Sequence, residues 1–348
     1  MTLIATSGLP DHWDDRYVEV PVAARRRWID LGSVWYPGNI LAFEASGASL
    51  AIVGTIIDAP LNAVRRCPWA ICSGALSDRG FAADGPHPWS GLSPHEVFPC
   101  LFLMFPYYLG DIIGSDAQDT AELDAFIADC EAWARGHGCR SVAYMYGTAP
   151  PEQAVALARA GYDRLTITQH GKLSIPWSGW EGYLASLSSR RRVRIRKEMA
   201  DINKAGLALA DEVVPENTRE LVEMRCNLLR KYGALGSVDD EIAMVNRVVA
   251  MRPRDTLTVM TARHEGKLVS YALFVRDGRQ WTPILAGSDY SLESRNGYFA
   301  TVFYLPISVA ASHEVEVIDF GVGAVEVKRL RGCDISDVVA HVRRILIS

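Results

Sequence analysis

The chain has 348 residues, of which 49% are hydrophobic and 22% charged, and its formal net charge is −5. This length favours two domains, because a single hydrophobic core usually stops growing near ~250–300 residues. The acidic balance excludes a protein that coats DNA or an anionic membrane with its whole surface.

The sequence shows no targeting or metal-binding signal, so we expect a cytoplasmic protein without a metal centre. The N-terminal sequence MTLIATSGLPDHWDD lacks the basic start and the apolar run of a signal peptide. The longest uncharged stretch, residues 296–312, is shorter than the roughly 20 apolar residues of a membrane span. The seven cysteines form no CxxC pair and the eight histidines are scattered, so we expect free buried thiols, no membrane insertion and no metal site.

The first half of the chain is predicted to alternate short strands with helices. The predicted elements, in chain order, are two strands within residues 41–57, a helix over residues 119–136, a strand over residues 140–147 and a helix over residues 150–162. Asp119 and Glu122 fit a capping box at the start of the first helix. Residues 67–99 are predicted to form a proline-rich loop, and loops of this length are often functional.

The second half is predicted to place three successive strands between helical segments. The predicted elements are helices over residues 178–205, 217–232 and 239–250, strands over residues 256–264, 267–276 and 280–287, an uncharged helix over residues 296–312, a strand over residues 314–321 and a short helix over residues 325–330. Ser178 with Glu181, and Asn217 with Glu220, fit capping boxes. The sequence DGR between the second and third strands is a strong hairpin signal.

The two halves carry the same order of elements. A hairpin that leads into an apolar strand occurs over residues 42–57 and again over residues 260–274. A strand, a glycine-bearing turn and a helix start occur over residues 140–162 and again over residues 315–333. We therefore predict an α+β fold in which one unit is used twice, with mixed, antiparallel-rich sheets flanked by helices.

Four segments of the second half resemble the GNAT-fold acyltransferases of the Fem-like branch: SLSSRRRVRIRKEM, LLRKYGA, LTVMTARHEGKLVSYALFVRDGRQWTPILAGSD and VIDFGVGAVEVKRLRGC. This branch contains peptidoglycan-bridge aminoacyltransferases and amino-acid ligases of natural-product pathways. The resemblance covers residues 175–335 and extends to the first half only through the tandem architecture. It implies a degenerate, acceptor-side GNAT-like domain over residues 1–174 and a GNAT-like acyltransferase domain over residues 175–348.

The sequence RRRVRIRK, residues 190–197, places six cations in eight positions of an acidic chain. On a helix, Arg190, Arg194 and Lys197 share one face. The roughly opposite face carries Ile195, Met199 and Ile202. Surface ion pairs with acidic loops are one interpretation, although each contributes only ~0–1 kcal/mol. The density of charge favours a clamp, together with Arg191, on the phosphates of one polyanionic ligand.

One segment helps to distinguish the possible acyl donors. In GNAT enzymes that use coenzyme A, a glycine-rich turn at the start of a helix binds the phosphates of the coenzyme. Here this segment reads SLESRNGYFATVFYL, in which only Arg295 and Gly297 fit such a turn and the bulky Tyr298 and Phe299 follow. This departure, with the cationic residues 190–197, favours aminoacyl-tRNA as co-substrate, with no bound cofactor and no DNA partner. Acyl-CoA remains the alternative donor.

Amide formation from an ester needs a neutral amine, a stabilised oxyanion and a proton for the leaving hydroxyl. The resemblance implies that Lys328, just after a glycine turn, lies near the acyl ester and stabilises the oxyanion or grips the terminal phosphate of the tRNA; a surface lysine is the alternative. Arg331 lies just beyond and joins the phosphate-binding residues. Asp319 is a candidate base or a turn-forming residue, and Asp289 is a candidate to bind the acceptor amine or to cap a helix.

The acceptor pocket is predicted around Trp281, Tyr290 and Tyr298, although aromatic residues at such positions are more often part of the core. The expected function is an N-acyltransferase that transfers an amino acid from aminoacyl-tRNA to an amino group of a small-molecule natural product or a peptidoglycan precursor. The alternatives are a CoA-dependent N-acyltransferase and a non-catalytic GNAT scaffold that binds an anionic partner.

Overall fold

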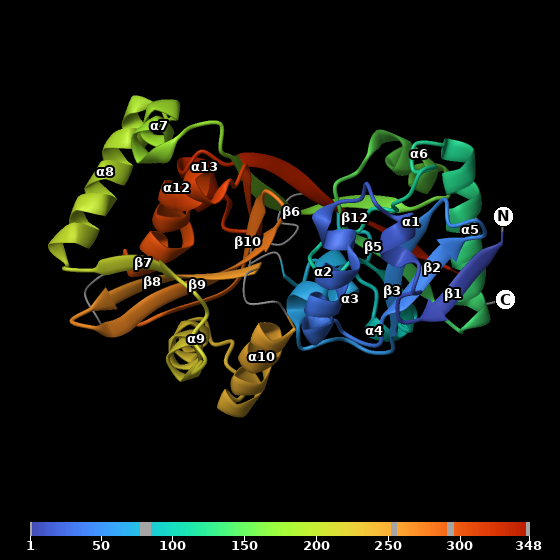
Figure 1. The fold of residues 1–348 in the computed structure, drawn as a ribbon. Helices are drawn as coiled ribbons and strands as arrows, with labels where there is room; N and C mark the ends of the chain where they lie inside the picture. Colours follow the sequence, from blue (N-terminus) through green and yellow to red (C-terminus); the bar gives the residue numbers. More distant parts are fainter. Residues whose placement is uncertain (1, 77–84, 252–255, 291–295, 346–348) are drawn as a thin grey trace. The chain divides into compact units, whose positions relative to one another are not determined.

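A computed structural model of the chain describes residues 2–76, 85–251, 256–290 and 296–345. It divides into two compact units (Figure 1), the first made of Met1–Gln169 with Ser336–Ser348 and the second of His170–Ile335. Each unit has its own run of hydrogen-bonded strands, its own helices and its own hydrophobic core. The α+β prediction is therefore confirmed.

The sheet of the first unit has the strand order β1-β2-β3-β4-β5-β12. Its strands are β1 (Leu3–Ser7), β2 (Leu41–Ala45), β3 (Ala51–Ile57), β4 (Cys100–Leu103), β5 (Ser141–Gly147) and the unit-1 part of β12 (Asp334–Arg344). β4 and β5 run parallel, whereas β1 with β2, β2 with β3, β3 with β4 and β5 with β12 run antiparallel. The predicted hairpin within residues 41–57 is confirmed, and Gly47 supplies the positive φ that its turn requires. β1, β4 and β12 were not predicted.

The helices of the first unit are α1 (Trp13–Arg16), α2 (Arg26–Gly32), α3 (Pro68–Cys72), α4 (Pro94–Val97), α5 (Thr120–Gly136) and α6 (Pro151–Arg159). Asp119 caps α5 as predicted, because its side chain accepts from the backbone N–H groups of Ala121 and Glu122. The segment predicted as a loop, residues 67–99, contains α3 and α4. Both begin with a proline, whose missing N–H is tolerated in a first helical turn.

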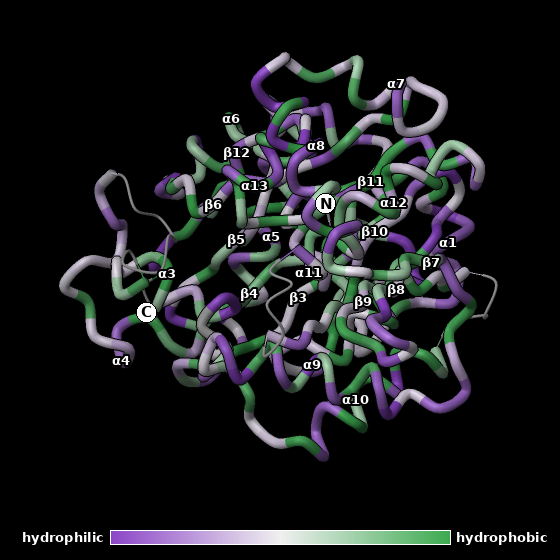
Figure 2. The backbone as a smooth tube through the Cα atoms, turned by 90° about the vertical axis from the view of Figure 1, so that its left-hand side faces the viewer, coloured by the Kyte–Doolittle hydropathy of each residue, from purple (hydrophilic) through white to green (hydrophobic). Residues whose placement is uncertain are grey.

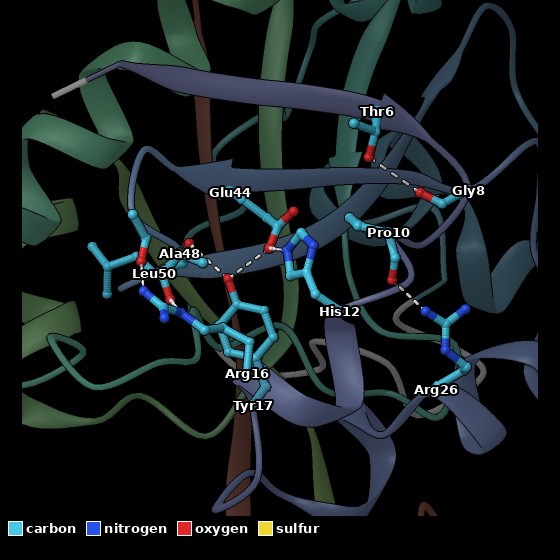
Figure 3. A network of polar contacts seen from close by, with 11 residues as sticks. Thr6, Gly8, Pro10, His12, Arg16, Tyr17, Arg26, Glu44, Ala48 and Leu50 are labelled. Atoms are coloured by element: carbon cyan, nitrogen blue, oxygen red, sulfur yellow. Dashed lines mark hydrogen bonds and ion pairs between the residues drawn. The ribbon is translucent and has the colours of Figure 1, made fainter.

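A buried carboxylate fastens the N-terminal segment of the first unit to its sheet. Glu44 on β2 accepts hydrogen bonds at Oε1 from the Tyr17 hydroxyl (2.9 Å) and pairs there with His12 Nε2 (3.1 Å). Figure 3 shows both rings pointing at this carboxylate from the two ends of α1. Burial and the neighbouring Glu44 raise the pKa of Tyr17, so its hydroxyl stays a donor at neutral pH.

The sheet of the second unit has the strand order β6-β11-β10-β9-β8-β7. Its strands are β6 (Asp163–Ser174), β7 (Ala208–Glu212), β8 (Leu257–His264), β9 (Lys267–Asp277), β10 (Gln280–Ser288) and β11 (Val317–Val322). Among the described residues of these strands, β10 and β11 run parallel and the other neighbouring strands run antiparallel. The two predicted hairpins that join β8, β9 and β10 are confirmed.

Two groups of helices cover opposite faces of the second sheet (Figure 1). One face carries α9 (Arg219–Lys231) and α10 (Val238–Ala250), and the other carries α7 (Gly179–Ser186), α8 (Ser189–Lys204), α12 (Leu305–Val309) and α13 (Val325–Leu330). Short 3₁₀ turns at Val22–Ala24, Ser33–Trp35, Val64–Arg66 and Ala310–His313 complete the helical segments. Within the described parts of the chain, no helix has the length and apolar character of a bilayer span.

Two helix predictions for the second unit were wrong in detail. The helix predicted over residues 178–205 is two helices, because Leu187 and Ser188 have extended backbones and the Leu187 side chain turns into the core. The helix predicted over residues 296–312 is a succession of α11 (Gly297–Phe299), a π turn (Ala300–Tyr304), α12 and a 3₁₀ turn. Pro306 has no N–H for the carbonyl four residues earlier, which weakens regular α-helical bonding there.

Candidate active site

The turn after β11 folds the chain back, so that Lys328 on α13 contacts the end of β11. Gly321 and Gly323 have φ values of +69° and +75°, a conformation that side-chain-bearing residues rarely adopt, and α13 begins two residues later. The Lys328 side chain runs back along this turn, and its Nζ donates to the Gly321 carbonyl at 2.5 Å. Lys328 is only 4% exposed. It is therefore not an ordinary solvated surface lysine.

Asp319 lies on β11, where three groups converge on its carboxylate. Oδ1 accepts from the Gly321 backbone N–H at 2.9 Å and lies 2.6 Å from His170 Nε2, while Oδ2 lies 3.6 Å from Lys172 Nζ. Burial by itself raises the pKa of Asp319, but the hydrogen bond and charge of His170, the charge of Lys172 and the Gly321 N–H together hold that pKa below its ordinary value. Asp319 is an ionised acceptor at neutral pH.

The register of β6 against β11 brings these groups together. His170 and Lys172 are two apart on β6, so both side chains point to one face of the sheet, and the β6–β11 pairing is irregular between Asp319 and Val322. Such bulges re-aim side chains beside functional sites. Gly171, between the two, leaves room for Lys328 on the opposite face of β6, because a Cβ there would meet Lys328 Cδ at 2.7 Å.

The sequence analysis missed His170. Its partner Asp319 is 149 residues away, and β6 was not among the predicted strands. A signal for β6 does exist, because Leu165, Ile167 and Leu173 alternate with polar residues and are all buried. The strand was therefore detectable from the sequence, although its partner was not.

The chemical content of this site is an imidazole, a carboxylate and two ammonium groups around one glycine turn. We call the set His170, Lys172, Asp319 and Lys328 the β6–β11 site. An imidazole held by a carboxylate is suited to proton transfer, and a buried ammonium is suited to stabilising a developing negative charge. Within the described residues, no group of three or more His, Cys, Asp or Glu side chains is arranged to hold a metal ion.

The cationic helix α8 has the amphipathic form that was predicted. Ile195 and Ile202 are fully buried, whereas Arg190, Arg194 and Lys197 are exposed. Figure 2 shows this helix as mostly hydrophilic. Arg191 is half-buried at the start of the helix. The structure thus presents most of the predicted phosphate-binding residues to solvent on one element of the second unit.

Arg331 is placed differently from the other predicted phosphate-binding residues. It is 1% exposed, and its Nη2 donates to Glu198 Oε2 at 2.7 Å and to the Tyr304 hydroxyl at 2.8 Å. Its guanidinium also lies over the Phe299 ring, 4.2 Å from the ring centre. Glu198 belongs to α8 and binds the exposed Arg194 with its other oxygen. Arg331 is therefore an internal link between α8 and α13.

The predicted acceptor residues contact other parts of the second unit than the β6–β11 site. Trp281 has no exposed surface and packs against Phe274 in the core. Tyr290 lies beneath Lys231, whose Nζ is 3.6 Å from its ring centre, and burial raises the pKa of both Tyr290 and Tyr298. The Asp289 N–H donates to Val269.

One residue of the predicted coenzyme A turn cannot be placed. Arg295 lies outside the residues that the structure describes. Its companion Gly297 is buried at the start of α11, a helix of three residues. The described part of this segment therefore contains the short helix α11 followed by the π turn Ala300–Tyr304.

Comparisons with known proteins agree with this architecture. The family model FemAB-like, described as peptidoglycan biosynthesis/recognition, matches residues 95–342. No curated protein matches the sequence significantly. Among solved structures, FemX superposes with a TM-score of 0.58 at 10% identity, covering 92% of this chain and 91% of FemX.

Two further structures share the fold. The C-terminal DUF2156 domain of a putative lysylphosphatidylglycerol synthetase from Agrobacterium fabrum has a TM-score of 0.57 at 12% identity, with 96% and 91% coverage. A tandem GNAT protein from the clavulanic acid biosynthesis pathway has a TM-score of 0.52 at 12% identity, with 98% coverage of each chain. The likeness confirms the predicted GNAT-type fold. The family match spans more than half of the chain, and this protein belongs to the FemAB-like family of GNAT-fold acyltransferases.

Proposed function

We propose that this protein is an aminoacyltransferase that moves an amino acid from aminoacyl-tRNA to an amino group of a small-molecule or peptidoglycan-precursor acceptor in the cytoplasm. The observation that carries the proposal is the pairing, within one unit, of a buried lysine on a glycine turn with an exposed cationic helix. The first suits an ester carbonyl, and the second suits the phosphates of a nucleic-acid donor. Family membership supports acyl transfer as the reaction class.

The residues have separate roles in this proposal. Arg190, Arg191, Arg194 and Lys197 bind phosphates of the tRNA, and Lys328 stabilises the oxyanion that forms when the amine attacks the ester. A buried ammonium stabilises such an oxyanion more strongly than an exposed one, because its field is less screened by water. Arg331 has no direct role with phosphate here and positions α13, on which Lys328 lies, against α8.

A binding titration with two donors tests the proposal. The wild-type protein is titrated with a charged tRNA pool and, separately, with acetyl-CoA at two salt concentrations. We expect salt-sensitive binding of tRNA that weakens in Arg190→Ala/Arg194→Ala. The slope of the logarithm of the binding constant against the logarithm of the salt concentration should become shallower by about 2, because each lost phosphate contact reduces this slope by about 1.

A matched control separates a defined phosphate clamp from general surface charge. Arg230→Ala/Arg247→Ala also removes two exposed arginines of the second unit, from α9 and α10, and we expect its tRNA affinity to stay within about twofold of wild type. Equal losses in both double variants would contradict the clamp. Binding of acetyl-CoA with no binding of tRNA would make the protein a CoA-dependent N-acyltransferase.

A further inference from the structure

Aminolysis of an ester requires one proton to be moved. The attacking amine nitrogen bonds to the ester carbonyl carbon, the bond from that carbon to the tRNA ribose oxygen breaks, and the nitrogen loses one proton while the ribose oxygen gains one. No proton is consumed overall, so a single group that accepts and then returns a proton is sufficient. This inference rests on the proposed function, and a thioester donor would need the same proton movement to sulfur.

The carboxylate of Asp319 is already occupied. Its Oδ1 faces both His170 Nε2 and the Gly321 N–H, and its Oδ2 faces Lys172. These contacts stabilise the charged form, and the pKa of Asp319 lies below its ordinary value. A carboxylate that binds its proton so weakly is a poor acceptor from an amine.

The imidazole beside it contacts Asp319 through only one of its two ring nitrogens. When His170 donates its Nε2 proton to Asp319, the basic lone pair is on Nδ1. Lys172 on β6 is the charged side chain that shares the face of this pair, and the Lys328 stem lies over Gly171 on the other face of β6. The His170 side chain is 20% exposed, enclosed by the site yet open to solvent.

We propose that His170 is the proton-transfer residue of this acyltransferase and that Asp319 is its positioning residue. His170 Nδ1 accepts the proton from the attacking amine and returns it to the departing ribose oxygen. Asp319 holds the ring in the tautomer that makes this possible, as carboxylates do for catalytic histidines elsewhere.

The tautomer can be measured without any substrate. In the ¹⁵N-histidine NMR spectrum of the full-length protein, we expect the resonance that His170→Gln removes to show a protonated Nε2 and an unprotonated Nδ1 at neutral pH. Asp319→Asn should shift that resonance towards a tautomer mixture. A proton on Nδ1 in the wild type would overturn the assignment.

The kinetic test uses charged tRNA as donor and glycinamide as a minimal amine acceptor, with acetyl-CoA as a second donor. We expect His170→Gln to lower the turnover rate by at least about 100-fold, with unchanged tRNA affinity. Asp319→Asn should also lower the turnover rate, together with the change of tautomer in the NMR spectrum. His12→Gln, which removes the histidine of the His12–Glu44 pair in the first unit, is the matched control and should keep the wild-type rate.

The outcomes separate the two proposals. Wild-type turnover that His170→Gln leaves within about twofold overturns the role of His170 and leaves the proposed function intact. Turnover with acetyl-CoA but not with charged tRNA overturns aminoacyl-tRNA as donor. The turnover rate of His170→Gln relative to that of the wild type, measured with acetyl-CoA, then decides the role of His170. A rate loss equal in His12→Gln and His170→Gln shows a general structural effect and overturns it.

Discussion

Each unit of the protein holds a histidine against a buried carboxylate, yet the two pairs differ in their surroundings. In the first unit, the His12 side chain is 53% exposed, and Glu44 shares its Oε1 between His12 and the Tyr17 hydroxyl (Figure 3). In the second unit, Asp319 binds His170 and the N–H of a glycine turn that also receives Lys328. The first pair fastens a helix to a strand. The second holds an imidazole against a carboxylate at a glycine turn that also binds a buried lysine, which is an arrangement for chemistry.

The largest effect on stability is expected at Arg331, which links the elements behind the β6–β11 site. Arg331→Met leaves Glu198 without its buried partner, and breaking a buried ion pair typically costs about 3–5 kcal/mol. Urea unfolding measures the loss. Arg190→Met on the exposed face of α8 is the control and should change stability by less than about 0.5 kcal/mol. Full stability in Arg331→Met would refute the internal link.

The largest effect on activity without a comparable loss of stability is expected at Lys328. Lys328→Met keeps the apolar stem but removes the ammonium, so the turnover rate should fall by about 100- to 1,000-fold, the usual cost of one oxyanion-stabilising donor. The half-exposed Lys172 offers the matched variant, and Lys172→Met should lose less. If both variants lose activity equally, the oxyanion role belongs to the pair and not to Lys328.

The pH dependence of stability should differ between the units. On β12 of the first unit, burial and the nearby Arg164 lower the pKa of His341 to about 4. The unfolded chain then binds a proton near pH 6.5 that the folded chain binds only near pH 4, so stability present above pH 6.5 is lost as the pH falls between these values. The loss is roughly 3 kcal/mol, at about 1.4 kcal/mol for each pKa unit.

The variant His341→Gln should remove most of this acid sensitivity, as urea unfolding at pH 7 and pH 4.5 will show. Asp319 affects the free energy of unfolding in a lower pH range. Because its pKa is lowered, it contributes stability above its unfolded value near ~3.9 and loses it only at lower pH. An unchanged pH profile in His341→Gln would assign the acid sensitivity to other groups.

The smallest expected effect distinguishes the His12–Glu44 pair, which fastens a helix to a strand, from the His170–Asp319 pair of the β6–β11 site. Tyr17→Phe removes one donor to Glu44 and should cost about 1–3 kcal/mol in the free energy of unfolding, because a buried carboxylate loses a hydrogen bond. The acyl-transfer rate at saturating substrate should remain at the wild-type value. A rate loss larger than about tenfold in this variant would show that the first-unit pair also serves the reaction.

Local sequence determined much of the secondary structure. The Asp119 cap, the hairpins from β8 to β10 and the amphipathic face of α8 depend on residues a few positions apart, so their patterns are complete within short segments. The glycine turn and Lys328 were recognisable for the same reason, with help from the resemblance to the Fem-like branch.

Tertiary structure alone decided which of the candidate residues meet. Strand pairing is non-local, so only the register of β6 against β11 brought His170 to Asp319, and only the pairing of β12 with β5 assigned residues 336–348 to the first unit. Arg331 and Trp281 resemble surface and pocket residues in the sequence, yet packing buries both. Burial depends on all the neighbours that a side chain gains on folding, and those neighbours come from distant segments of the chain.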